Sequence, residues 1–158
     1  MKIDMIKWNE AIKLIEHTIE RKIHGVKYEI KETTTNSWEA FKKEISQGNF
    51  YVSAENCENT IYSKPEMNIK ARVWHDLIHL SEDLSFSLFD EILVCNFQMD
   101  DVEEVGKQFN YPEETIVLAR SIIYTDIVKQ AEYYSSKGKF IAHQKSFVQN
   151  HIFNYVFN

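Results

Sequence analysis

The chain has 158 residues, of which 44% are hydrophobic and 27% charged, and this size and composition fit one soluble domain over 1–158. Its net charge of −6 argues against broad binding to nucleic-acid phosphates, and its two cysteines make no disulfide framework. The longest uncharged apolar stretch, 92–99, is too short to cross a membrane, and residues 1–8 lack the apolar run of a signal peptide. We therefore expect a cytoplasmic protein without a membrane partner.

Glycine and proline are scarce, with 4 and 2 residues, which favours long helices over a turn-rich β fold. Helical spacing of apolar residues predicts a first helix over 4–24, and alternation over 26–30 then predicts a strand. A short helix should end near Gln47, and candidate strands follow at 50–52 and 60–62. The expected fold is mainly α, a compact helical domain with a small antiparallel β element in its N-terminal third.

Longer helices are predicted in the rest of the chain. Pro65 marks the entry to a helix over 66–82, and a second helix should follow over 88–109. Pro112 suits the first turn of a helix over 112–136, and a last helix is expected over 139–157.

The helix over 66–82 carries the clearest functional pattern. Asn68, Arg72, His75 and His79 are spaced by four, three and four residues, so they form one polar strip along the helix. Two imidazoles four residues apart can bind one divalent metal ion, here Zn, Mn or Fe. The alternative interpretation is that both histidines make hydrogen bonds within the core.

Asp76 completes an HDxxH pattern. Its side chain is one methylene shorter than the glutamate in the HExxH of zinc proteases, so the protease mechanism is not expected here. Asp76 could be a metal ligand, a group that orients a histidine, or a general base. Further candidates lie on other predicted helices: Glu91 as a catalytic carboxylate, Asp126 as a metal ligand, and Gln130 on the same helix face as Asp126.

The remaining candidates would shape or bind a substrate. Arg72, a catalytic and substrate-binding candidate, could hold an anionic group through its planar guanidinium. Trp74 could form an apolar wall that strengthens charge interactions in a pocket, and Asn68 and Gln130 could bind substrate through their amides.

The segment from residue 60 to 150 resembles an uncharacterised family of small proteins encoded by tailed bacteriophages. The shared pattern corresponds here to Asn68, Arg72, Trp74, His75, Asp76, His79, Phe86 or Phe89, Glu91, Asp126, Gln130, Tyr133 or Tyr134, Gly138, Lys139, Phe140 and Gln144. The family is expected to have Glu where this chain has Asp126. The resemblance implies a site at these residues, and a host cytoplasm as the location, but no particular activity.

A looser similarity is to HD-type metal-dependent phosphohydrolases, which are helical and bind metal through a histidine, a His-Asp doublet and a distant aspartate. His75 and Asp76 would be the doublet, Asp126 the distant aspartate, and His17 or His24 the first histidine. The strand-like segment before residue 62 departs from the helical pattern of those enzymes.

The sequence indicates two alternative functions, one enzymatic and one non-enzymatic. The first is a metal-dependent hydrolase that acts on a nucleotide or another phosphoester, with Asp76 or Glu91 taking a proton from water. The second is a non-enzymatic phage protein that binds a host protein, in which the polar strip is a structural hydrogen-bond network. A small ligand bound without chemistry is a third interpretation.

Overall fold

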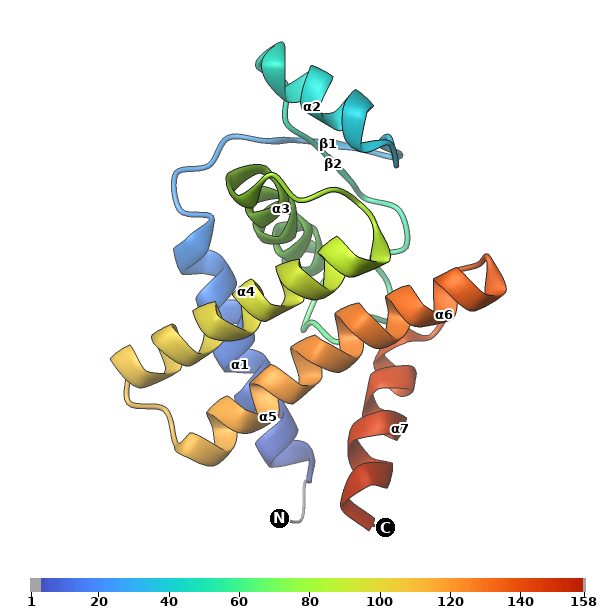
Figure 1. The fold of residues 1–158 in the computed structure, drawn as a ribbon. Helices are drawn as coiled ribbons and strands as arrows, with labels where there is room; N and C mark the ends of the chain where they lie inside the picture. The colour runs from blue at the N-terminus through green and yellow to red at the C-terminus, as the bar shows by residue number, and fades with distance from the viewer. Residues whose placement is uncertain (1–3, 158) are drawn as a thin grey trace.

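Helices dominate the computed structural model of this chain, which describes residues 4–157, with side chains up to residue 153 (Figure 1). The prediction of a mainly α fold is confirmed. The elements in chain order are α1 (Met5–Lys22), β1 (Glu29–Lys31), α2 (Trp38–Ser46), β2 (Tyr51–Ser53), α3 (Pro65–Glu82), α4 (Leu88–Gln108), α5 (Glu113–Tyr124), the π-helical turn η1 (Thr125–Lys129), α6 (Gln130–Lys137) and α7 (Gln144–Phe157).

The two strands are parallel, so the prediction of an antiparallel element is wrong. Ile30 pairs with Val52, and Glu29 with Tyr51. Helix α2 lies between the strands in the chain, and a crossover of this length allows the second strand to return in the same direction. The third candidate strand, 60–62, forms no strand, and it belongs instead to the loop that leads into α3.

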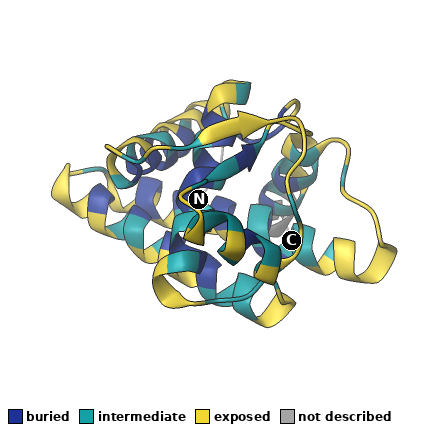
Figure 2. Ribbon diagram, turned by 90° about the horizontal axis from the view of Figure 1, so that it is seen from above, coloured by how far each residue is buried: buried dark blue, intermediate teal, exposed yellow. Residues whose placement is uncertain are grey.

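The core lies where α1, α4 and α5 pack against one another. Figure 1 shows α4 and α5 running side by side across α1. Buried side chains such as Leu14, Ile15, Val94 and Ile122 fill this junction, and Figure 2 shows buried residues on the inward sides of the helices. Among the described residues, no helix combines the length and the apolar character that crossing a membrane requires.

A short connection joins α3 to α4 and brings their site residues together. Asp83 ends α3 in the left-handed conformation at φ 50°, and the Leu84 amide donates to the carbonyl of His79. Ser87 then caps α4 by accepting a hydrogen bond from the Asp90 amide. As a result, the last turns of α3 lie against the first turns of α4.

Helix α5 continues into α6 through η1, so the predicted helix over 112–136 exists but contains a π-helical turn. Thr125 and Val128 of this turn are buried, whereas Asp126 is only partly buried. A π-helical turn changes the phase of a helix and therefore redirects the side chains that follow.

Candidate metal centre

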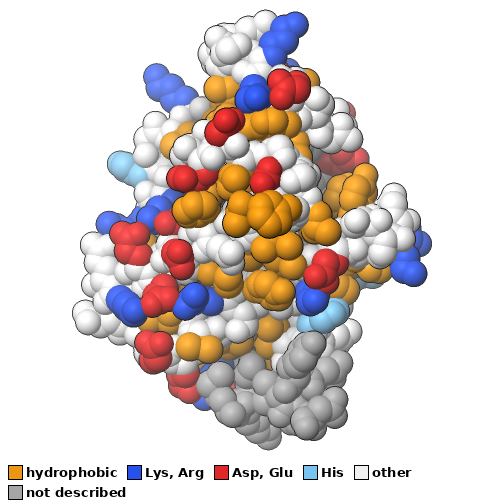
Figure 3. All heavy atoms as spheres, in the orientation of Figure 1, with side chains coloured by type: hydrophobic (Ala, Val, Ile, Leu, Met, Phe, Trp, Pro, Cys, Tyr) orange, Lys and Arg blue, Asp and Glu red, His pale blue; other side chains and the backbone are white. Residues whose placement is uncertain are grey.

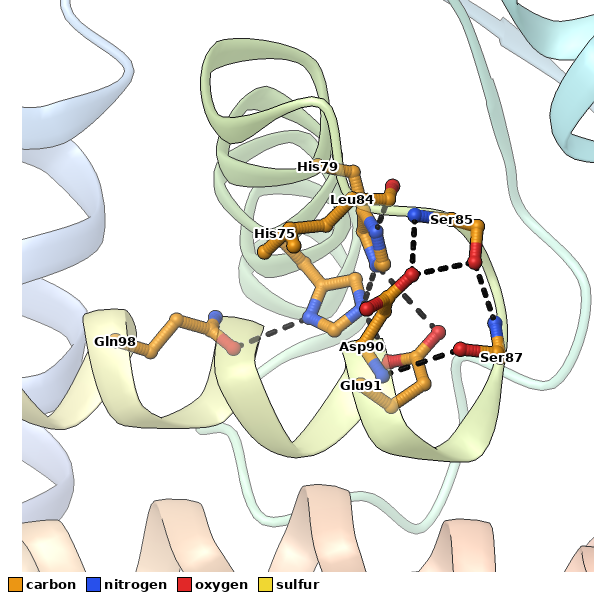
Figure 4. Close-up of polar contacts among 8 residues, drawn as sticks. All are labelled: His75, His79, Leu84, Ser85, Ser87, Asp90, Glu91 and Gln98. Carbon is orange, nitrogen blue, oxygen red and sulfur yellow. Dashed lines mark hydrogen bonds and ion pairs between the residues drawn. The ribbon is translucent and has the colours of Figure 1, made fainter.

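His75 and His79 of α3 meet Glu91 of α4 at one point (Figure 4). The two Nε2 atoms lie 3.0 Å apart. Glu91 places Oε2 at 2.9 Å from Nε2 of His75 and Oε1 at 3.4 Å from Nε2 of His79. Two nitrogens that bind one ion at about 2.1 Å lie about 3.0–3.4 Å apart, so this spacing fits a shared divalent ion.

The other nitrogen of each imidazole faces a hydrogen-bond acceptor. Nδ1 of His75 lies 3.1 Å from Oε1 of Gln98, and Nδ1 of His79 lies 2.9 Å from the carbonyl oxygen of Leu84. A carbonyl oxygen only accepts, so each Nδ1 carries a proton, and in the neutral imidazole each Nε2 then presents its lone pair to the other ring. This arrangement of acceptors behind the ligands is typical of histidines that bind metal.

With both imidazoles neutral, no positive charge lies between His75, His79 and Glu91. Two Nε2 lone pairs and a carboxylate converge there, and they repel one another unless a proton or a cation lies between them. A divalent ion meets this requirement with all three groups at once. Because the chemistry and spacing of the donors agree, these residues could hold the metal ion that the sequence predicts.

The pKa shifts of the clustered groups also show that a positive charge is favoured at this point. Burial lowers the pKa of His75, but the Glu91 carboxylate outweighs that effect and raises it above its ordinary value. Burial would raise the pKa of Glu91, yet the two imidazoles hold it well below its usual range. Burial raises the pKa of Asp76 to about 6, against the opposing influence of His75, His79 and Arg72.

Apolar side chains and a hydrogen-bonded turn fix the buried side of the centre. The fully buried ring of His79 meets the ring of Phe86 edge-on, with centroids 5.1 Å apart, and the ring of Trp38 on α2 lies 6.2 Å from that of His79. In the turn before α4, the Ser85 amide and hydroxyl donate to Asp90 (Figure 4). This turn also carries the Leu84 carbonyl that orients His79.

The other side of the centre opens into a pocket of about 920 Å³. Its walls include His75 and Glu91, together with Arg72 from α3, Asp126 from η1 and Gln130 from α6. Ligand positions that the protein does not fill would therefore face this pocket. The pocket wall thus contains five of the predicted site residues, and His79 lies directly behind it in the same cluster as His75 and Glu91.

Arg72 holds the pocket wall in place. Its guanidinium donates to the carbonyl oxygen of Ser53 at 2.8 Å and to that of Asn56 at 3.5 Å. These two hydrogen bonds hold β2 and the loop that follows it against α3. A guanidinium has five N–H donors, so Arg72 keeps capacity for an anionic group.

Asn68 and Trp74 lie outside the pocket. Trp74 is 1% exposed, and its Nε1 donates to Asp101 at 2.9 Å, which joins α3 to α4. Asn68 is buried, and its Nδ2 has no hydrogen-bond partner within the described part of the chain. Neither residue is in a position to touch a ligand in the pocket, so their predicted substrate contacts have no support from the geometry.

Asp126 lies on the pocket wall but not among the three clustered ligands. Gln130 donates from Nε2 to Oδ1 of Asp126 at 2.5 Å. The histidines named by the similarity to HD-type enzymes lie elsewhere: His17 contacts Phe109 and Tyr111, and His24 is exposed. Glu91 thus stands as the third ligand candidate.

Several parts of the site were not expected from the sequence. The Leu84 carbonyl is a backbone group with no signature in the sequence, and the pocket wall from residue 34 to 36 is an ordinary polar loop. Gln98 offered one signal, since it lies seven residues after Glu91 and therefore on the same face of α4.

Comparison of the chain with protein-family models, with curated proteins and with solved structures gave no match.

Proposed function

We propose that the protein is a metal-dependent hydrolase that acts on a phosphoester, with nucleotides as the preferred substrate class. One observation carries the proposal: Nε2 of His75, Nε2 of His79 and the Glu91 carboxylate converge within 4.8 Å beside a pocket. A host cytoplasm, as the resemblance to phage proteins implies, is part of the same proposal.

A divalent ion held by His75, His79 and Glu91 would supply Lewis-acid chemistry, since a bound ion lowers the pKa of water and polarises a phosphoester. The protein's own residues would do the rest. Asp76, beside His75 on α3, or Glu91, which lines the pocket, would accept a proton from water. Arg72 would orient the anionic part of the substrate on the pocket wall.

The first experiment measures metal content and phosphoester hydrolysis on the same purified samples. We expect one divalent ion per chain and release of p-nitrophenolate from bis(p-nitrophenyl) phosphate, or of phosphate from a panel of nucleotides. His75→Ala, His79→Ala and Glu91→Ala should each lose both properties, whereas the exposed His24→Ala should keep them. Stoichiometric metal that survives the two histidine substitutions would refute the proposed centre.

A second function, binding of a host protein without chemistry, draws support from a different surface. Figure 3 shows hydrophobic side chains gathered on the face along which α4 and α5 run. Phe89 is 69% exposed, and Phe97 and Val117 are also exposed on these helices. Exposed apolar patches of this kind commonly mark protein contacts.

The two functions predict opposite results for the same variants. If the protein acts by binding a host protein, Phe89→Ser and Phe97→Ser should abolish capture of that protein, and His75→Ala should leave capture intact. A folded, metal-free wild type with no hydrolytic activity would favour this second function over the first.

A further inference from the structure

Asp126 lines the pocket but is not one of the three candidate metal ligands. The proposed metal centre therefore assigns it no role. Asp126 enters the pocket from η1, whereas His75 and Glu91 enter from α3 and α4. A bound phosphoester that reaches the metal ligands would consequently have Asp126 on another wall of the same pocket.

The π-helical turn contains Asp126, an acid within an otherwise apolar segment, and this residue lies on the pocket wall. Thr125 turns inward and its hydroxyl donates to the Ser121 carbonyl at 2.8 Å, while Val128 is buried in the core. Asp126 is left facing the pocket. π-helical turns are rare, and they occur frequently at functional sites.

The surroundings of Asp126 favour a carboxyl group that carries a proton. Burial raises its pKa to about 7, although Gln130 and the charge of His75 act in the opposite direction. Other titratable groups near it are Tyr62 and Cys95, whose own pKa values are raised by burial and by the charge of Asp126. Gln130 occupies Oδ1, so the remaining oxygen can present the proton to the pocket.

We propose that Asp126 is a catalytic acid that protonates the leaving group of the phosphoester, and not a metal ligand. This inference rests on the proposed function. In the step, the water oxygen forms a bond to phosphorus, the bond between phosphorus and the leaving oxygen breaks, and the proton of Asp126 moves to that oxygen. The attacking water loses one proton to a site carboxylate and then to solvent, and Asp126 regains one from solvent.

The test compares Asp126→Asn with the wild type on two substrates that differ only in the leaving group. Methyl p-nitrophenyl phosphate has a leaving group that departs without protonation, and methyl phenyl phosphate has one that needs it. General acids typically contribute about 10²–10⁴-fold in rate. Asp126→Asn should therefore slow hydrolysis of the phenyl ester about 100-fold or more, and that of the p-nitrophenyl ester much less.

Two readouts do not depend on activity. Asp126→Asn should bind the metal ion as tightly as the wild type, because Asp126 is not a ligand. The infrared band of a protonated carboxyl group should be present in the wild type at pH values below the pKa of Asp126 and absent from the variant. Asp100→Asn, on the exposed side of α4, is the matched control and should behave as the wild type in every assay.

Each contrary outcome has a separate meaning. Loss of metal in Asp126→Asn would show that Asp126 is a metal ligand. An equal loss of rate on both esters would show that Asp126 is not the proton donor. Either result overturns the inference and leaves the proposed function standing. Absence of hydrolysis by the metal-loaded wild type on both esters would overturn the proposed function and the inference together.

Discussion

Gln98 contacts the candidate metal centre through one hydrogen bond, which its side-chain oxygen accepts from Nδ1 of His75. Gln98→Leu keeps a similar volume in this buried position but removes the acceptor, so the His75 ring is free to rotate or to change tautomer. Loss of such a partner typically costs about 10–100-fold in metal affinity. We predict a loss of this size for Gln98→Leu, measured by titration with Zn²⁺ or Mn²⁺.

Gln108→Leu is the matched control for this prediction, because Gln108 lies at the exposed end of the same helix. It should bind metal as the wild type does. Equal affinities for Gln98→Leu and the wild type would show that the acceptor neither positions His75 nor fixes its tautomer.

Asp126 links the stability of the metal-free protein to pH. Its pKa in the folded chain, about 7, lies above the ordinary value of 3.8. The folded state therefore binds the proton more tightly, and the stability from that proton is lost as pH rises from about 4 through about 7. Asp126→Asn cannot ionise, so its free energy of unfolding should exceed that of the wild type increasingly over this range.

Urea unfolding of both proteins across this pH range measures the effect. A difference of one unit in pKa corresponds to about 1.4 kcal/mol, so the gap should reach a few kcal/mol at neutral pH. Chelator in every sample keeps metal from contributing. A difference between the two proteins that stays constant with pH would mean that Asp126 ionises in the folded state as it does in the unfolded chain.

Gly106 permits the close approach of α4 to α5. A β-carbon at this position would lie 2.6 Å from Cγ1 of Ile116 and 2.8 Å from its Cδ1, and Ile116 is 2% exposed and has little room to move. Overpacking of a core typically costs about 1–3 kcal/mol, whereas alanine gains about 1 kcal/mol of helix propensity over glycine. We predict that Gly106→Ala lowers the free energy of unfolding by about 1 kcal/mol.

Ile116→Val supplies the control for this contact, because it removes Cδ1. The double variant, Gly106→Ala with Ile116→Val, should be less destabilised than the sum of the two single variants, as expected for residues that touch. Strict additivity in urea unfolding would show that the two positions do not share a packing constraint.

Individual helices were predictable because their signals are local. The spacing of Arg72, His75 and His79 placed these side chains on one side of α3, and Pro65 marked its start. The direction of β2 was predicted wrongly, since two strands of three residues carry no information on the path of the chain between them. The π-helical turn at Thr125–Lys129 was not foreseen, because its residues suit an α-helix equally well.

The pocket itself depends on segments far apart in the sequence. Loops near Asn36 and Asn56, the helices that carry His75 and Glu91, and η1 with Asp126 all contribute to its walls. The sequence pointed to Glu91 and Asp126 as candidate partners of the histidines but could not say which of them reaches the imidazoles. That choice depends on how α3, α4 and η1 pack, which is settled by the core between them.

We propose that Nε2 of His75, Nε2 of His79 and the carboxylate of Glu91 hold one divalent ion. Anomalous diffraction at the metal absorption edge, on crystals of the Zn²⁺-loaded protein, tests it most directly. We predict a single strong peak about 2.0–2.2 Å from these three groups, with Asp126 outside the ligand sphere. No peak at this point, or a peak bound through Nδ1 or through other residues, would contradict it.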